Sequence, residues 1–154
     1  MKIKIPSKRN MLEKEEFNLR VFFDEYNKYY KVCAYNSKKE EVARATFKLS
    51  TYPTRHVWLY KISTDELYQH KGYSSAIMYA MEYIAIQNRF DHIEAKYFPE
   101  NEYAKAFYDK HDYVIFKDGY ETYLSKSLDH DFIKQQIESN IQGFQIENMP
   151  EKER

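Results

Sequence analysis

The fold of this chain is decided at Tyr68-Gln69-His70-Lys71-Gly72-Tyr73-Ser74-Ser75-Ala76. A β-branched and aromatic run, Val57–Ile62, comes before it and an apolar helical pattern over Ala76–Ala85 follows directly, so the stretch is a turn from a strand into a helix. Gly72 is one of only three glycines, and its position where the helix begins indicates a backbone that another residue would hinder. The first amides of a helix have no intrahelical partner and lie at the positive end of its dipole. The turn therefore predicts an anion site, for which a phosphate is the natural ligand.

Alternating apolar side chains predict strands before this turn. The expected strands are Phe17–Asp24, Tyr29–Tyr35, Val42–Leu49 and Val57–Thr64. Lys2–Ile5 is a further, short strand candidate, and Ser7 is a candidate cap for a helix over Lys8–Glu16. Short, turn-prone connections indicate that consecutive strands are antiparallel neighbours.

The pattern changes after the central helix, which we expect to end near Asn88. Asp91–Tyr97 alternates like a fifth strand, and a second helix opens at Asn101. Because a helix connects them, Val57–Thr64 and Asp91–Tyr97 are expected to run parallel.

The chain closes with a hairpin and a tail. An Asp118-Gly119 pair lies between two aromatic runs, Tyr113–Phe116 and Tyr120–Leu124, which is a hairpin signal. Apolar side chains recur at helical spacing over Phe132–Ile141, and Gln145–Arg154 has the composition of a frayed end. We therefore expect one α+β domain over residues 1–128 and a C-terminal helical extension and tail over residues 129–154.

Charge and composition exclude several classes of protein. Lys and Arg number 24, as do Asp and Glu, and this zero net charge argues against a nucleic-acid partner. The lone Cys33 cannot form an internal disulfide and no apolar signal segment follows Met1, so we expect a cytoplasmic protein. No apolar run approaches the ~20 residues of a membrane span. The five histidines lack the spacing of a metal-binding motif, so no metal is expected.

Two motifs in order resemble the GNAT superfamily of acyl-CoA-dependent N-acyltransferases, over roughly Val57–Leu128. The family's acetyl-CoA motif has Arg or Gln, two residues, Gly, one residue, then Gly or Ala; Gln69 and Gly72 fit it, and Ser74 departs from it. A second signature opens the next helix and is matched by Asn101, Ala104, Tyr108, Lys110 and Tyr113. Asp112 stands where the family usually has Gly. The two motifs together are far more specific than either alone.

The resemblance implies a mixed, mostly antiparallel twisted sheet with a central crossover helix and with the fourth and fifth strands splayed apart. It implies acetyl-CoA as acyl donor, bound by Ile62, Thr64, Gln69, His70, Lys71, Gly72, Tyr73, Ser74, Ser75 and Asn101. Loop amides would converge on the pyrophosphate, with Gly72 leaving their approach clear, and the main chain of Ile62 and Thr64 would pair with the pantetheine arm. Tyr108 matches the residue taken to protonate the departing thiolate.

The function implied is transfer of an acetyl group to a primary amine by direct attack in a ternary complex, on a small-molecule or peptide acceptor. The alternative is a CoA-binding or protein-interaction module without turnover, which is favoured by Ser74, by Asp112 and by the absence of an acidic residue from Val57–Thr64. The general base stays open between Asp65, Glu66, Glu121 and a chain of waters.

The acceptor side departs from most relatives, in which two helices between the first two strands wall the pocket. Here only Glu25–Lys28 separates the strand that ends at Asp24 from the next strand. If Lys2–Ile5 is instead the first strand, one short helix over Lys8–Glu16 is the most that lies between the first two strands. We therefore expect an open acceptor cleft, or one completed by the helix over Phe132–Ile141 or by the second subunit of a homodimer.

Overall fold

The computed structural model describes residues 1–6, 14–131, 135, 141–142 and 145–150. Its elements in chain order are β1 (Lys2–Pro6), β2 (Lys14–Asp24), β3 (Tyr29–Tyr35), β4 (Glu41–Ser50), β5 (His56–Thr64), the 3₁₀ turn η1 (Glu66–Tyr68), α1 (Tyr73–Gln87), β6 (His92–Tyr97), α2 (Glu102–Lys110), β7 (Val114–Lys117), β8 (Thr122–Ser127), β9 (Ile141–Gln142) and β10 (Ile146–Asn148).

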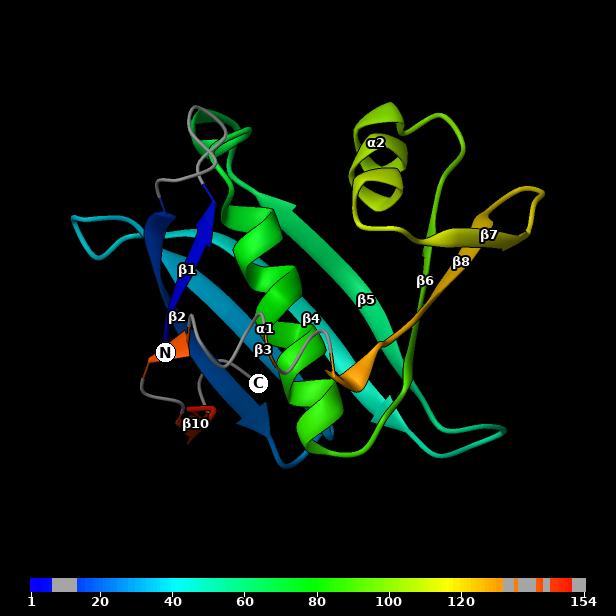
Figure 1. The fold of residues 1–154 in the computed structure, drawn as a ribbon, viewed down its shortest axis with the longest axis horizontal. Helices are drawn as coiled ribbons and strands as arrows, with labels where there is room; N and C mark the ends of the chain where they lie inside the picture. The colour runs from blue at the N-terminus through cyan, green and yellow to red at the C-terminus, as the bar shows by residue number, and fades with distance from the viewer. Residues whose placement is uncertain (7–13, 132–134, 136–140, 143–144, 151–154) are drawn as a thin grey trace.

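The described strands form one mixed sheet in the order β7-β8-β6-β5-β4-β3-β2-β1-β9, with β10 beside β2. Neighbours are antiparallel except for β5 with β6 and β10 with β2. The chain passes from β5 through α1 to β6, which is the crossover that a parallel pair requires, and Figure 1 shows α1 lying across one face of the sheet. The expected α+β architecture, mostly antiparallel with a central crossover helix, is confirmed.

The core lies between α1 and the sheet. Small strand side chains beneath the helix let the two approach closely, and they are Ala34, Ala43, Ala45 and Ala95. The helix fills this space with Ile77, Met81 and Ile84, all fully buried. Each such side chain contributes about 1.5–3 kcal/mol when it leaves water, so α1 is fixed by burial over its whole length.

One buried side chain of α1 is charged. Glu82 is 1% exposed, and its carboxylate accepts a hydrogen bond from Lys126 Nζ of β8 at 2.6 Å. Burial raises the pKa of Glu82, and the charge of Lys126 opposes that rise. The pair cross-links α1 to β8 inside an otherwise apolar interface, and the nearly all-apolar helical pattern did not predict it.

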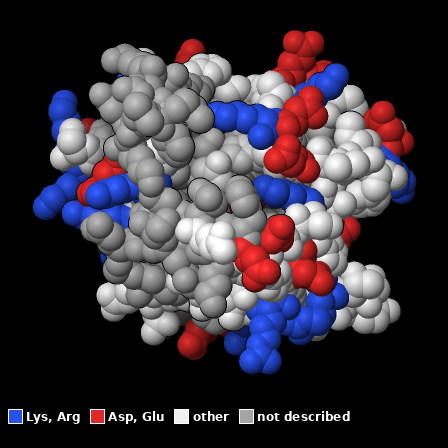
Figure 2. Space-filling model, viewed as in Figure 1, with Lys and Arg blue, Asp and Glu red and all other residues white. Residues whose placement is uncertain are grey.

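The surface mixes charges of both signs. On the described part of the face in Figure 2, Lys and Arg side chains are interspersed with Asp and Glu and form no continuous basic patch. None of the described helices combines the length and apolar character needed to cross a membrane.

The N-terminal segment differs from the helix expected over Lys8–Glu16. Residues 8–13 lie outside the described residues, but Lys14, Glu15 and Glu16 begin β2 and pair with β1, so the prediction is wrong there. The backbone bonds offered by β1 outweigh the modest helical preference of Lys and Glu. Residues 7–13 join β1 to β2, and seven residues make only about two helical turns. This segment is too short for two helices, and the reduced acceptor wall stays a prediction.

The C-terminal tail also differs from expectation. Ile141 belongs to β9, which pairs with β1, and Ile146–Asn148 forms β10 instead of a frayed end. Met149 is 4% exposed and packs on Phe22 and Cys33. His130, Asp131 and Gln135 are helical, whereas the rest of the helix expected over Phe132–Ile141 lies outside the described residues. The domain boundary at residue 128 stays a prediction.

Candidate active site

The sheet opens between β5 and β6. The two strands pair only where Val57–Leu59 meets Ile93–Ala95. Tyr60 is a bulge, because Leu59 pairs with Phe47 while Lys61 pairs with Thr46. A bulge bends its strand, and it lies where β5 leaves β6, so the expected splay of these two strands is present (Figure 1).

Two adjoining cavities occupy the opening. The splay cavity, about 380 Å³, is lined by Tyr60, Lys61, Ile62, Ser74, Lys96, Tyr97, Phe98, Asn101, Tyr103, Ala104, Phe107, Tyr108 and Glu121. The loop cavity, about 140 Å³, is lined by Thr64, Tyr68, His70, Gly72, Tyr73, Ser74, Ser75, Tyr103, Ala106, Phe107 and Lys110. Since Ser74, Tyr103 and Phe107 line both, the cavities meet at these side chains. Nine of the expected site residues therefore lie around one continuous space, and only Gln69 and Lys71 do not.

The side chains of Gln69 and Lys71 contact other residues near the turn and do not line either cavity. The Gln69 side-chain amide donates to the Thr64 carbonyl at 3.2 Å, which ties the turn to the end of β5. The Thr64 hydroxyl lies 2.5 Å from the Ser74 hydroxyl and holds the same junction from the other side. Lys71 Nζ lies 5.4 Å from the centre of the Tyr68 ring and lines a different hollow. The structure therefore gives Gln69 and Ser74 supporting positions, and Ser74 uses its hydroxyl where the family has Gly or Ala.

Position 72 requires glycine because of its backbone conformation and its close packing against the core. Its φ of 97° is left-handed, and a Cβ at this position would lie 3.0 Å from Phe17 Cζ and 3.3 Å from Ile5 Cδ1. The absent side chain therefore faces the core of the protein. This corrects the expectation that Gly72 clears the approach of a ligand, because the conformation and the packing on Phe17 already demand glycine.

The first turn of α1 faces the loop cavity with unpaired amides. The first helical bond runs from the Ala76 amide to the Gly72 carbonyl, so the amides of Tyr73, Ser74 and Ser75 precede the ladder. No side chain caps this end, and its first turn contains no acidic residue. Lys110 lines the same cavity. Free amides, the helix dipole and a lysine are together the groups that can hold an anion, so this end of the cavity is the candidate anion site.

A buried hydrogen bond joins the two helices behind this site. Ser75 Oγ lies 3.0 Å from His111 Nε2, and both residues are less than a tenth exposed. Burial, and then the charges of Lys126 and Lys110, lower the pKa of His111 to about 4, so the imidazole is neutral at pH 7. Ser75, which the family resemblance assigns to the cofactor, thus also has a structural contact, and His111 lies in the interior. The pairing depends on helix docking and leaves no local sequence signal.

Tyr108 lies in the wall of the splay cavity. It is 4% exposed, its ring stacks on Tyr97 with centroids 5.9 Å apart, and Phe107 and Tyr113 flank it. Burial raises the pKa of Tyr108 to about 12, so the phenol keeps its proton at neutral pH. Among the described residues its hydroxyl has no hydrogen-bond partner, which leaves the proton available to a group in the cavity.

The second motif also has a structural explanation. Asn101 caps α2, because its Oδ1 accepts a hydrogen bond from the Ala104 amide at 3.1 Å. Asp112 has a φ of 66° directly after α2. The Tyr113 amide bonds the Tyr108 carbonyl and the Asp112 amide bonds the Asp109 carbonyl, which is a Schellman motif. Asp112 therefore adopts the left-handed conformation that glycine takes at low cost, and the departure from the family pattern keeps the geometry.

The three acidic candidates for the general base differ in whether they line the splay cavity. Asp65 pairs with Arg44 at 2.8 Å and Glu66 is exposed in η1. Glu121 lines the splay cavity and pairs with Lys96 Nζ at 2.9 Å, which lowers the pKa of Glu121. Glu121 is thus the acidic side chain that the structure brings to the cavity.

Sequence comparison agrees with this arrangement. The profile of the Acetyltransferase (GNAT) family matches residues 3–113, which is most of the chain. The chain belongs to the GNAT family of acetyltransferases. No curated protein sequence matches it.

Solved structures of GNAT proteins share this fold at low sequence identity. An acyl-CoA N-acyltransferase from Klebsiella pneumoniae is 14% identical, with a TM-score of 0.61 over 68% of this chain and 75% of that one. The PaiA N-acetyltransferase of Thermoplasma acidophilum, solved with coenzyme A, is 15% identical, with a TM-score of 0.60 over 66% of this chain and 62% of that one. The GNAT domain of PAT from S. lividans is 10% identical, with a TM-score of 0.67 over 82% of this chain and 97% of that one.

Proposed function

We propose that this GNAT protein transfers an acetyl group from acetyl-CoA to a primary amine by direct attack in a ternary complex. The observation that carries the proposal is the continuous cavity from the first turn of α1 to the Tyr108 side chain. Its two ends have the chemistry that the reaction needs, because free amides suit a phosphate and a buried neutral phenol suits a leaving sulfur.

The residues of the loop cavity fit the diphosphate of coenzyme A. The amides of Tyr73, Ser74 and Ser75 would hold it, with Lys110 adding positive charge. The edge of β5 that bends away from β6 at Tyr60 is open to a peptide-like arm beside Ile62. The thioester supplies an activated acetyl group.

Tyr108 would donate its phenol proton to the sulfur as the carbon–sulfur bond breaks. General-acid help of this kind is worth ~10²- to 10⁴-fold in rate. Glu121 would accept a hydrogen bond from the acceptor amine, directly or through one water, and so help to remove the proton that the amine loses. Lys96 keeps that carboxylate ionised.

The acceptor is proposed to be a small molecule or a peptide with a free amine. The splay cavity has aromatic walls, with Tyr60 and Phe98 each about half exposed, and the seven residues between β1 and β2 are too few for two covering helices. Completion of this wall by a second subunit is a further proposal. A cytoplasmic location is also proposed, and it agrees with a buried thiol at Cys33, whose pKa is raised to about 12, chiefly by burial.

Thiol release over a panel of amines tests the proposal, beside calorimetry with acetyl-CoA and desulfo-CoA. Tyr108→Phe should lower kcat about 10²- to 10⁴-fold and leave cofactor affinity unchanged. Tyr26→Phe is the matched control, because Tyr26 is 80% exposed in the β2–β3 turn and should keep full rate.

Two results would contradict the proposal. Full activity of Tyr108→Phe would make Tyr108 a packing residue. Cofactor binding without thiol release over the whole panel would support the alternative, a CoA-binding module without turnover. The departures at Ser74 and Asp112 no longer favour that alternative, since both residues fit the loop and helix geometry.

A further inference from the structure

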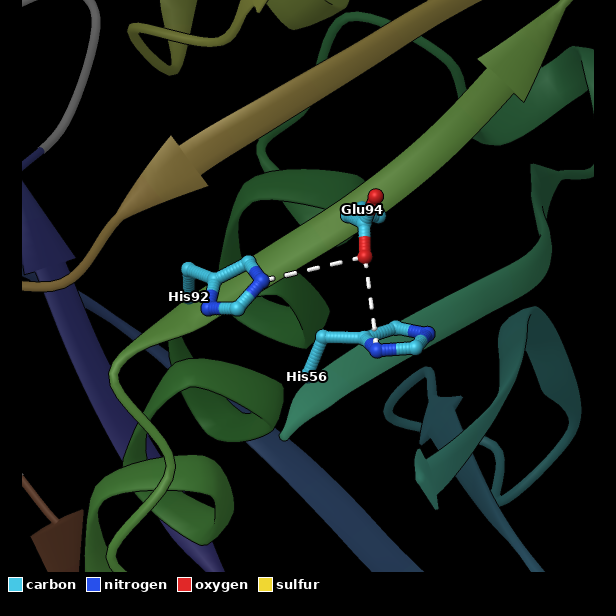
Figure 3. Close-up of side chains that lie close together, drawn as sticks. All are labelled: His56, His92 and Glu94. Carbon is cyan, nitrogen blue, oxygen red and sulfur yellow. Dashed lines mark ion pairs between the residues drawn. The ribbon is translucent and has the colours of Figure 1, made fainter. Parts of the chain in front are cut away.

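Two histidines and a glutamate meet where β5 and β6 begin. His56 opens β5, and His92 and Glu94 lie on β6, all on the face of the sheet opposite α1. Parallel pairing of Val57 with Ile93 places His56 beside His92, and Figure 3 shows the Glu94 carboxylate within ion-pair distance of both rings, with the His92 ring directed at it. Their side chains are 12%, 29% and 23% exposed, so the cluster is largely shielded but open to water.

The distances within the cluster suit a shared ion. Glu94 Oε2 lies 3.4 Å from His56 Nδ1 and 3.7 Å from His92 Nε2, and the candidate ligand atoms all lie within 4.8 Å of one another. These separations exceed ordinary N–H···O hydrogen bonds of about 2.7–3.2 Å. Tetrahedral ligands about 2.0–2.1 Å from a zinc ion lie roughly 3.3 Å apart, which is close to the two separations from Glu94, and an ion would draw the two imidazoles closer together.

The surroundings orient both imidazoles. His92 Nδ1 lies 3.1 Å from Asp91 Oδ1, so a proton on Nδ1 leaves the lone pair of Nε2 directed toward Glu94. His56 Nδ1 lies 2.9 Å from the Thr54 carbonyl oxygen. This contact is a hydrogen bond when Nδ1 carries the proton, so an ion would bind His56 Nδ1 by replacing that proton, with the tautomer changing to Nε2–H and the Thr54 oxygen close enough to be a fourth ligand. Two imidazoles with one carboxylate form a ligand set of zinc and of other first-row metals.

We propose that His56, His92 and Glu94 bind one divalent first-row transition-metal ion, with Asp91 as a positioning residue for His92. The site lies at the beginning of both strands, whereas the splay cavity lies beyond the bulge at Tyr60. It is therefore separate from the acetyl-transfer site. An ion there would tie β5 to β6 beside a ladder of only three residue pairs and so stabilise the end of the sheet that does not open.

Metal titration of the EDTA-treated full chain tests this, using Zn²⁺ by calorimetry and Co²⁺ by its visible d–d absorption. We expect one equivalent of Zn²⁺ to bind, with a Tm raised by several degrees at saturating metal. His92→Gln and Glu94→Gln should each weaken binding at least tenfold, and Asp91→Asn should weaken it about 10- to 100-fold. All three variants should match the wild-type Tm in EDTA, because they change the affinity for the ion and leave the fold intact.

His70→Gln is the matched control, since His70 lies on the loop beyond the other end of β5 and should leave the affinity for Zn²⁺ unchanged. The proposal is overturned if Zn²⁺ does not bind saturably at millimolar concentration, in which case the cluster is an ion-pair cluster only. It is equally overturned if His92→Gln and Glu94→Gln bind Zn²⁺ as tightly as the wild type does.

Discussion

His111 shows how one buried side chain couples the two helices. It closes the C-terminal end of α2 and contacts the first turn of α1 through Ser75, so the position of the anion site depends on it. Tyr79 and Phe107 pack against its ring, with centroids 5.7 and 4.7 Å away. The imidazole is held neutral by its surroundings, and this has a measurable effect on stability.

We predict that acid destabilises the protein through His111. The unfolded chain takes up this proton near pH ~6.5, whereas the folded chain does so only near its pKa of about 4. Stability is therefore lost as pH falls from about 6.5 to about 4, by up to about 3 kcal/mol for this group. Urea denaturation at pH 7 and pH 5 should show a smaller loss in His111→Gln than in the wild type. His130→Gln, at an exposed site, should keep the wild-type loss. Equal losses in all three proteins would contradict the prediction.

Single residues of the site were only partly predictable. Gly72 and Tyr108 were identified from motif spacing because the family resemblance fixes their place along the chain. The reason for Gly72 lay elsewhere, in Phe17 of a distant strand. The buried Glu82 and its partner Lys126 could not be foreseen, since the pair forms only when α1 docks on β8.

At the scale of elements, both helices end in the same way. After α1 the Phe90 amide bonds the Ala85 carbonyl and the Arg89 amide bonds the Ile86 carbonyl, with Arg89 at a φ of 64°. This is the Schellman motif that also ends α2 at Asp112. Glycine is absent from both left-handed positions, so each helix ends at some conformational cost.

Asp112→Gly should therefore stabilise the protein by about 1 kcal/mol. Besides the left-handed backbone, its carboxylate faces the negative end of the α2 dipole, and its charge raises the pKa of the buried Glu82. Thermal or urea unfolding measures the gain. Arg89→Gly is the comparison, because it relieves the same backbone cost without removing a negative charge and should gain less. A loss of stability in Asp112→Gly would show that its carboxylate makes a necessary contact.

Element types were predicted well where the pattern was periodic. The strands before the turn and the central helix follow directly from alternating and helical apolar spacing. The bulge at Tyr60 was not predicted, because it is defined by pairing with β4 and leaves Val57–Thr64 looking like an ordinary strand. The beginning of β2 was missed for the same reason, since its first residues are held by β1.

At the scale of the whole molecule, the tail completes the sheet. The long strand β2 pairs with β1 over its first half, and β10 covers the same edge over Val21–Phe23. Arg20 Nε donates to Glu147 Oε2 at 2.8 Å and fastens the added strand. Contacts between residues more than 120 positions apart carry no signal in local sequence, so the tail was expected to be helical and frayed.

Met149→Ala should cost about 2 kcal/mol of unfolding free energy, because it removes a buried side chain that packs on Phe22 and Cys33. Removal of residues 143–154 should cost more, since β10 and the Arg20–Glu147 pair are lost as well. Denaturation in urea measures both changes. Asn148→Ala, at an exposed site on the same strand, should stay within about 0.5 kcal/mol of the wild type. A Met149→Ala protein as stable as that control would place the tail outside the cooperative fold.

The opening between β5 and β6 also divides the sheet for folding. Within the sheet, three residue pairs form a seam between β1 to β5 and a smaller unit made of β6, β8 and β7, which is otherwise held by its packing on α1 and by the Lys126–Glu82 hydrogen bond. Structural units joined by few hydrogen bonds open locally at less free energy than global unfolding requires. We therefore expect amide hydrogens of β6 and β8 to exchange faster than those of β3 and β4, which require unfolding of the whole domain. The opening proposed to hold the cofactor is thus also where we expect a protease to cut first.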